Sequence, residues 1–229
     1  MTTFEKVIKN TFRFVGLDIR LQKRTNVDFW TTDKAFQSLY RQLGDNVLLS
    51  EVRCFILWQF VKVAARREGE AAEIGVYQGG TARLLSKTLS NTGKTLHLFD
   101  TFSGMPATDP SRDIVQEGDF RDTSLQTVRE YLGDCENVEF HPGFFPDTGR
   151  VVEAKRFSFV HIDVDIYQSV KDCCEFFYPR MSPGGIMLMD DYGSRNCPGV
   201  RQAAEEFFHN KLEFPCYLPS GQSIVIMES

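Results

Sequence analysis

Two pairs of aspartates follow two apolar runs in the second half of the chain. Asp163 and Asp165 come at the end of FSFVHIDVD, and Asp190 and Asp191 come at the end of GIMLMDD. Four converging carboxylates would raise one another's pKa, because each negative charge disfavours ionisation of its neighbours. Mg²⁺ would remove this conflict, since it prefers carboxylate oxygens and keeps positions open for water or substrate. Three carboxylates can then be ligands while the fourth stays free as a base, although any single aspartate could instead cap a helix or lie in a solvated loop.

A glycine-containing turn follows an earlier apolar run, in the segment EIGVYQGGTARLL. Glu73 and Gly75 lie at the expected end of a strand, and Gly79 and Gly80 lie at the start of a helix. Glycines there let the backbone approach a ligand closely, and the start of the helix offers free N–H groups. The turn matches neither the dinucleotide fingerprint nor the phosphate loop. Its acidic residue suits a cation or an amino group, although glycines in such turns are also common for structural reasons alone.

Asp100 ends the next apolar run, TLHLFD, and lies 25 residues after Gly75. A carboxylate at this place can accept both hydroxyls of a ribose, or it can cap the loop that follows. Together with the glycine turn, Asp100 favours a cofactor that contains adenosine but no pyrophosphate. S-adenosylmethionine fits, because it brings a ribose, an adenine, an amino-acid end and a positive sulfonium.

The elements that must position these residues change in type near residue 68. Residues 1–68 have helical periodicity, whereas from residue 71 short apolar runs alternate with helical stretches. This alternation predicts βαβ units and a mostly parallel sheet with helices on both faces. The last two runs are joined by a short SGQ turn and are expected to pair antiparallel at the sheet edge. Such a sheet binds its ligand at the carboxyl ends of the strands, where every motif above is expected to lie.

Composition narrows the class of partner. The 229 residues carry a net charge of -5, which makes the chain a poor candidate for binding nucleic acid. No apolar run is long enough to span a bilayer, and the N-terminus does not resemble a signal peptide. Six scattered cysteines without Cys-x-x-Cys favour reduced thiols and a cytoplasmic location. The first 24 residues form a basic amphipathic arm that could touch a membrane surface or pack on the core or on a second subunit, so a homo-oligomer is possible.

Six segments resemble the macrocin O-methyltransferase family in the same order along the chain. They span roughly residues 70–208 and are EIGVYQGGTARLL, FDTFSGMP, GDFRDTSLQTVREYL, FHPGFFPDT, HIDVDIYQSVKDCCEFFYPRMSPGGIMLMDDYG and CPGVRQAAEEFF. The most specific part is Asp-x-Asp-x-Tyr-x-Ser with the later Pro-Gly-Gly and Asp-Asp-Tyr. The chain departs from the family pattern at Val164, where Gly is usual, and at Phe144, where Trp is usual. The second change could alter the adenine or acceptor pocket.

The resemblance implies a class I, S-adenosylmethionine-dependent enzyme that methylates sugar hydroxyls of natural products. It implies a Rossmann-like α/β fold, with a mostly parallel seven-stranded sheet and an antiparallel edge strand. Residues 69–229 would form the methyltransferase domain. Residues 1–68 show no match to the family, and from their position alone this helical extension is expected to cap the acceptor site or to contact a subunit. The implied metal ligands are Asp163, Asp190 and Asp191, and the implied general base is Asp165. The implied cofactor contacts are Glu73, Gly75, Tyr77, Gly79, Asp100, Ser103, Ser124, Gly143 and Phe144.

The expected mechanism follows from the chemistry of the sulfonium, whose methyl group is already activated. Mg²⁺ on the acceptor hydroxyl would lower its high pKa, and Asp165 would take the proton. Holding the oxygen close to the methyl carbon can contribute on the order of 7–11 kcal/mol. The expected partner is therefore a small hydroxylated acceptor, and a vicinal diol or a catechol would suit a bidentate metal.

Three other readings of the same residues stay open. A catechol-type or other small-molecule O-methyltransferase would share the cofactor and the metal. A haloacid-dehalogenase-type phosphatase also has Asp-x-Asp after a strand, but Tyr167 stands two residues beyond Asp165, where that class has Thr or Val. A non-catalytic, cofactor-binding protein would bind the cofactor without turnover on any hydroxylated acceptor.

Overall fold

The computed structural model describes residues 28–228. Tertiary contacts divide the chain into two compact units, Met1–Asp33 and Lys34–Ser229. The described part of the first unit contains one helical turn, α2 (Phe29–Thr32), in which the Thr31 hydroxyl donates to the Asp28 carbonyl over 2.7 Å. The basic arm expected in the first 24 residues lies outside the described residues.

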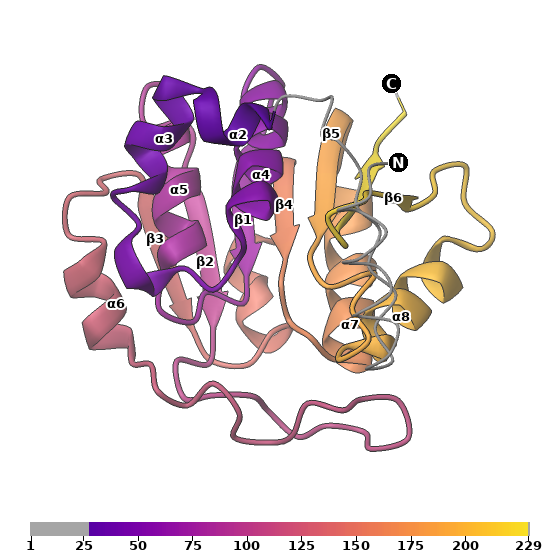
Figure 1. Cartoon of the computed structure of the whole chain (residues 1–229). Coiled ribbons are helices and arrows are strands. Elements are labelled where there is room, and N and C mark those ends of the chain that lie inside the picture. The colour runs from indigo at the N-terminus through magenta and orange to yellow at the C-terminus, as the bar shows by residue number, and fades with distance from the viewer. Residues whose placement is uncertain (1–27, 229) are drawn as a thin grey trace, which may run out of the picture. The chain divides into compact units, whose positions relative to one another are not determined.

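The second unit is built on a seven-stranded sheet. Its strands, in sheet order, are β3 (Val138–Pro142), β2 (Leu96–Asp100), β1 (Glu70–Ile74), β4 (Phe157–Ile162), β5 (Met181–Met189), β7 (Ser223–Ile226) and β6 (Cys216–Tyr217). The first five run parallel, so their carboxyl ends meet at one edge of the sheet (Figure 1). Strands β7 and β6 run antiparallel at the side of the sheet. The predicted α/β fold, with its antiparallel edge, is confirmed.

Helices cover both faces of this sheet (Figure 1). The helices of the second unit are α3 (Lys34–Tyr40), η1 (Gly44–Asn46), α4 (Glu51–Ala64), α5 (Gly80–Leu89), α6 (Leu125–Tyr131), η2 (Asp147–Val152), α7 (Tyr167–Phe177), η3 (Tyr178–Arg180) and α8 (Pro198–Phe208). Helices α4 and α5 pack on one face and on each other, while α7 and α8 pack together on the opposite face. Since α3 and α4 belong to the same unit as the sheet, this unit begins upstream of the change of pattern at residue 68.

Helix α7 shows how the sequence periodicity fixes the packing. Val170, Cys173, Cys174 and Phe177 recur at helical spacing, and all four are buried. The Phe177 ring meets the Phe157 ring edge to face at 5.1 Å between centroids. Burying a side chain of this size stabilises the fold by about 1.5–3 kcal/mol.

Strand β4 is buried along its whole length, as expected for a central parallel strand with helices on both faces. This strand therefore gives the residues that follow it a rigid base. In the part of the chain that the structure describes, no helix is long and apolar enough to cross a membrane.

Candidate active site

A cavity of about 280 Å³ opens at the carboxyl ends of the parallel strands. Nine of the predicted site residues line it, namely Gly75, Tyr77, Asp100, Gly143, Phe144, Asp163, Asp165, Asp190 and Asp191. Its wall is completed by the segment from Asn46 to Leu49 and by Arg53 of α4. Turns after five strands thus contribute to one site, as expected at the carboxyl edge of an open parallel sheet.

The four aspartates divide into two overlapping groups. Asp163, Asp190 and Asp191 each offer an oxygen within 4.8 Å of the others. A carboxylate oxygen of Asp165 lies in a second group with Asp191 and the Cys197 sulfur, again within 4.8 Å. The thiol of Cys197 donates to Asp165 Oδ1 over 3.5 Å. The three predicted ligands therefore converge, with the predicted base beside them.

The backbone turns sharply at two of these aspartates. Strand β4 ends at Ile162 and β5 ends at Met189. Asp165 and Asp191 then adopt left-handed conformations, with φ of 59° and 50°. A non-glycine residue in this region costs on the order of 1–2 kcal/mol, and aspartate is among the residues that tolerate it best. The turn expected after β5 is therefore present. Strand β4 ends before Asp163, so the backbone from Asp163 to Asp165 does not continue as an extended strand.

Burial and mutual repulsion raise the pKa of three of the carboxyls. Burial, followed by Asp190, raises the pKa of Asp163 well above its ordinary value. Burial and then Asp191 raise the pKa of Asp165 to about 7. Burial also raises the pKa of Asp190, although His161 and Arg53 oppose the shift. The cluster therefore holds more negative charge than its surroundings compensate.

A hard divalent cation fits this set of donors. Asp190 Oδ1 is buried and has no hydrogen-bond partner among the described residues. Leaving a buried carboxylate oxygen unpaired is costly, so the site favours an occupant that accepts its lone pairs. Three carboxylate oxygens on one side of a cavity are typical of a Mg²⁺ site that keeps positions free for water or substrate.

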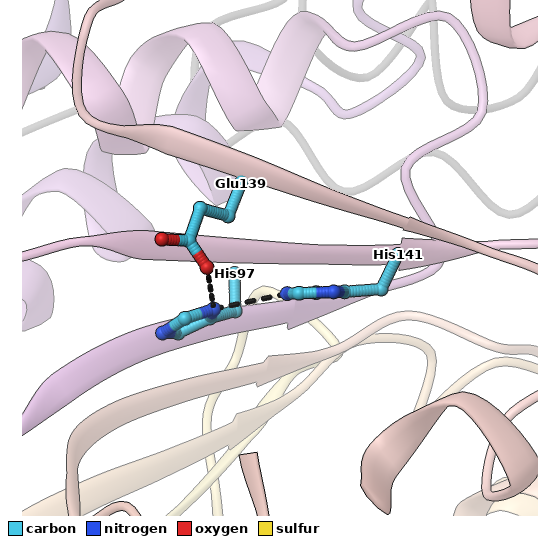
Figure 2. Close-up of side chains that lie close together, drawn as sticks. All are labelled: His97, Glu139 and His141. Atoms are coloured by element: carbon cyan, nitrogen blue, oxygen red, sulfur yellow. Dashed lines mark hydrogen bonds and ion pairs between the residues drawn. The ribbon is translucent and has the colours of Figure 1, made fainter. Parts of the chain in front are cut away.

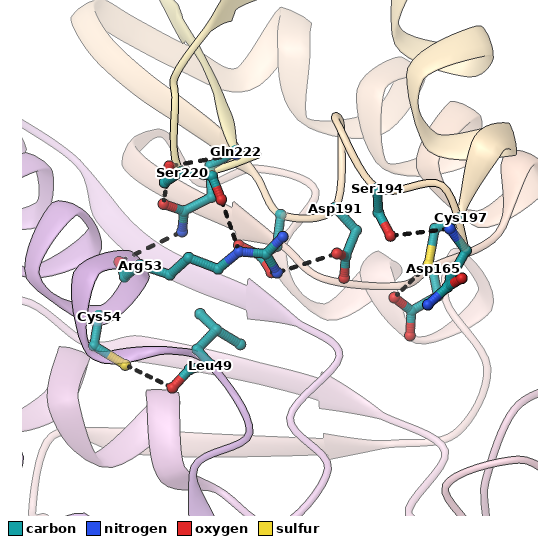
Figure 3. Close-up of polar contacts among 11 residues, drawn as sticks. Leu49, Arg53, Cys54, Asp165, Asp191, Ser194, Cys197, Ser220 and Gln222 are labelled. Atoms are coloured by element: carbon teal, nitrogen blue, oxygen red, sulfur yellow. Dashed lines mark hydrogen bonds and ion pairs between the residues drawn. The ribbon is translucent and has the colours of Figure 1, made fainter. Parts of the chain in front are cut away.

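Arg53 pairs with the same cluster and was missed by the sequence analysis. Its Nη1 donates to Asp190 Oδ2 over 2.8 Å. The same nitrogen donates to Asp191 Oδ1 over 3.1 Å (Figure 3). Burial opposes its charge, but Asp190 and Asp191 outweigh burial and raise its pKa. The 137 residues between Arg53 and Asp190 hide the pairing in the sequence. The one available signal was a charged residue inside the apolar stretch of α4.

The glycine turn lies directly beneath the aspartates. Gly75 has φ of 88°, and a Cβ at this position would lie 1.8 Å from the Asp163 carbonyl oxygen. Only glycine fits here, because any side chain would clash with Asp163. The absence of a side chain lets the turn after β1 contact the segment that follows β4. The turn thus brings the predicted cofactor loop against the predicted metal ligands.

Asp100 organises the loops around the cavity. Its Oδ2 accepts from the backbone N–H groups of Val76, at 2.6 Å, and Tyr77, at 2.9 Å. Its Oδ1 accepts from the Phe102 N–H over 2.6 Å. The carboxylate therefore caps two turns while it also lines the cavity. The expected contact with a ribose stays a prediction.

Four predicted cofactor residues do not line the cavity. Glu73 is fully buried, and its Oε1 lies 2.9 Å from His161 Nδ1. Glu73 is therefore paired with His161 on the neighbouring strand β4, and its expected contact with the cofactor stays a prediction. Ser103 is exposed, and Gly79 is the left-handed N-cap of α5. Ser124 caps α6 by accepting from the Thr127 N–H over 3.1 Å.

A separate group of metal-type side chains lies on β2 and β3, formed by His97, Glu139 and His141 (Figure 2). The facing ring nitrogens of the two histidines are 3.0 Å apart, while the ring centroids are 5.2 Å apart. These distances mean that the rings meet edge to edge, as in an N–H···N hydrogen bond. Lys155 adds positive charge nearby, which disfavours a cation. This group is a hydrogen-bonded cluster outside the cavity, in which only His97 is buried and Glu139 is exposed.

Comparisons with known proteins show which family the chain matches. Residues 61–215 match the family described as Macrocin-O-methyltransferase (TylF). The chain is 29% identical over 211 residues to the mycinamicin III 3''-O-methyltransferase of Micromonospora griseorubida, covering 81% of this chain and 82% of that protein. It is 31% identical over 143 residues to a rhamnosyl-tetracenomycin-C 4'-O-methyltransferase of Streptomyces olivaceus, covering 56% of this chain and 55% of that protein.

Solved structures show the same fold. The O-methyltransferase NovP matches with a TM-score of 0.64 at 21% identity, over 77% of this chain and 80% of that chain. The calicheamicin methyltransferase CalS11 matches with a TM-score of 0.66 at 15% identity, over 99% of this chain and 93% of that chain. The cavity at the sheet edge and the family match over residues 61–215 lead to one conclusion. The chain belongs to the macrocin O-methyltransferase family.

Proposed function

We propose that this enzyme uses Mg²⁺ to help transfer a methyl group from S-adenosylmethionine to a sugar hydroxyl of a glycosylated natural product. The observation that carries the proposal is the convergence of Asp163, Asp190 and Asp191 within 4.8 Å, with Asp165 beside them in the same cavity. The names of the relatives, which act on sugars of mycinamicin and tetracenomycin, support the class of acceptor.

The cofactor half of the cavity is formed by the turns after β1, β2 and β3. Gly75 removes the side chain that would block close approach to the backbone, and Asp100 holds the adjoining turns in place. Phe144, which is 40% exposed, offers a flat apolar face at the edge of this half. Bound S-adenosylmethionine would supply an activated methyl group here. The protein's own task is to fix its orientation and to keep its sulfonium near the carboxylates.

The metal half is formed by Asp163, Asp190 and Asp191. Bound Mg²⁺ would act as a Lewis acid toward the acceptor hydroxyl. The three carboxylates would hold it against the sheet edge, where the Asp190 oxygen that has no partner is already buried.

Asp165 is the residue best placed to accept the proton of the acceptor hydroxyl. It lies beside the three carboxylates that converge for the metal and is not one of them, and in the metal-free protein burial and Asp191 raise its pKa to about 7. The left-handed turn lifts Asp165 out of the strand, and the Cys197 thiol holds its Oδ1.

The rim of the cavity favours a large acceptor with an apolar body. Leu48, Phe120 and Phe144 are 63%, 39% and 40% exposed, and all three line the cavity. An exposed apolar rim of this kind marks a binding surface. A free catechol would leave most of the rim uncovered, whereas a macrolide or a related aglycone would cover it while its sugar enters the site.

A transfer assay with radiolabelled cofactor tests the proposal. Glycosylated macrolides, the matching aglycones and simple catechols are compared as acceptors in the presence of Mg²⁺. Label is expected on the glycosylated compounds only. Label on catechols alone would favour the small-molecule alternative, and label on no acceptor despite cofactor binding would favour a non-catalytic protein.

A further inference from the structure

We infer that Arg53 is the built-in counter-cation of the aspartate cluster, so that the arginine and a divalent metal ion oppose each other at Asp190 and Asp191. This inference rests on the proposed metal site. It assigns a function to α4, which lies far upstream of the aspartates in the sequence. In the metal-free protein, the guanidinium supplies the positive charge that the buried carboxylates need.

The contacts of Arg53 show that it serves both carboxylates at the end of β5. One nitrogen, Nη1, lies 2.8 Å from Asp190 Oδ2 and 3.1 Å from Asp191 Oδ1. Among the ion pairs of residues 28–228, Arg53 is the only Lys or Arg paired with any of the four aspartates of the cluster. The Asp190 side chain is fully buried, so its pairing with Arg53 is poorly screened by solvent.

Arg53 is also held in place from outside the cluster. Its Nε donates to the Ser220 carbonyl over 3.1 Å, and its own carbonyl accepts from Gln222 Nε2 over 3.5 Å (Figure 3). A Cβ on Gly221 would lie 2.9 Å from Arg53 Nη2, so the turn before β7 closes tightly on the guanidinium. These contacts do not involve the aspartates, and they would keep the arginine near the site when a metal binds.

The charge of Arg53 is expected to weaken the binding of Mg²⁺ to the aspartates. A fixed positive charge close to a divalent cation repels it, and the repulsion is stronger in a partly buried site than in water. Removing the charge of Arg53 is therefore expected to raise the affinity for Mg²⁺ on the order of tenfold or more. The same change leaves Asp190 and Asp191 unpaired in the metal-free protein, so it should lower the melting temperature in the presence of chelator.

The experiment measures Mg²⁺ binding to the full chain by calorimetry and thermal unfolding with and without chelator. Arg53→Met removes the charge and keeps the apolar stem, and Arg53→Gln provides a second neutral variant if the first does not fold. Arg53→Lys keeps the charge. Arg83→Met is the matched control, because Arg83 pairs with Asp134 outside the cavity and its loss changes the net charge of the chain equally.

The neutral variants should bind Mg²⁺ more tightly than the wild type and melt lower without it. Arg53→Lys and Arg83→Met should bind Mg²⁺ with about the wild-type affinity. Equal or weaker Mg²⁺ binding by the neutral variants would overturn the role of Arg53 while leaving the metal site intact. A wild-type protein that binds no Mg²⁺ would instead overturn the proposed metal site itself.

Discussion

At the scale of single residues, the site depends on how the chain turns immediately after two strands. Asp165 and Asp191 have φ of 59° and 50°, and these left-handed turns separate the base from the metal ligands. An extended strand would have placed Asp163 and Asp165 on the same side and made them equivalent. The turn therefore allows two aspartates with the same side chain to have different chemical roles.

The first prediction concerns Asp165→Asn. The amide keeps the shape of the side chain but cannot take a proton, so turnover should fall by about 10²–10⁴-fold. Mg²⁺ and cofactor binding should persist, because neither depends on this carboxylate. Steady-state kinetics with calorimetry on the same preparation checks both, and a turnover within a fewfold of the wild type would remove Asp165 as the base.

Sequence alone could identify the aspartates but not their partners. Asp163, Asp165, Asp190 and Asp191 stand out because apolar runs end at them. Arg53 could not be found in this way, because its pairing with Asp190 spans 137 residues and depends on how α4 packs on the sheet. Of the residues expected at the glycine turn, Gly75 lines the cavity and Glu73 does not. The sequence could not separate the two, because it does not show which side chains of a buried strand face the cavity.

A second prediction at this scale concerns His97, whose pKa is lowered to about 4, from 6.5, first by burial and then by His141. The folded protein binds this proton more weakly than the unfolded chain does, so acid favours unfolding. The stability from a neutral His97 is complete above pH 6.5 and is lost as the pH falls toward 4. The loss should reach no more than about 3 kcal/mol.

Denaturant unfolding of the wild type and His97→Asn between pH 7 and pH 4 measures this loss, because the asparagine has no proton to gain in this range. The wild type should lose stability relative to the variant as the pH falls. Asp165, whose raised pKa acts in the opposite direction, is present in both proteins and so cancels. If the difference in stability between the two proteins did not change with pH, the lowered pKa of His97 would be contradicted.

At the scale of elements, the parallel sheet was predictable because short apolar runs alternate with helical stretches along the chain. The alternation also predicts a helix between β3 and β4, but the structure has only the short 3₁₀ helix η2, Asp147–Val152, in this place. Gly149 lies there, and a Cβ on it would lie 3.0 Å from the rings of Phe145 and Phe176. The conformation of this segment therefore depends on its packing against the two rings. Hydrophobic periodicity in the sequence does not reveal contacts of this kind.

The contact between the turn after β1 and strand β4 gives a prediction for Gly75→Ala. The new Cβ would lie 1.8 Å from the Asp163 carbonyl oxygen, so one of the two segments must move. The variant should lose about 3 kcal/mol or more of stability, and the aspartate cluster should lose metal affinity with it.

Gly93→Ala is the control for backbone strain without a clash, because Gly93 has φ of 73° and nothing within 4 Å of its Cβ position. It should cost only about 1 kcal/mol. Equal losses of stability for the two variants in urea would show that the contact between Gly75 and Asp163 has no special role.

At the scale of the whole molecule, the described part of the second unit brings the cofactor turns, the aspartates and α4 around one cavity. We propose that residues 1–68 contribute to the acceptor side, and the segment from Asn46 to Arg53 already lines the cavity. Of residues 1–68, the part up to Asp33 belongs to the first compact unit. An oligomer in which it contacts a second copy remains a prediction.

The central claim is that three aspartates hold a metal ion required for methyl transfer to a sugar hydroxyl. The most direct measurement is transfer of labelled methyl to a glycosylated acceptor by wild type and Asp163→Ala, first in excess chelator and then after Mg²⁺ is restored. Wild-type transfer should vanish in chelator and return with Mg²⁺, and Asp163→Ala should stay inactive although it still binds the cofactor. Full transfer in chelator, or by Asp163→Ala, would contradict the account.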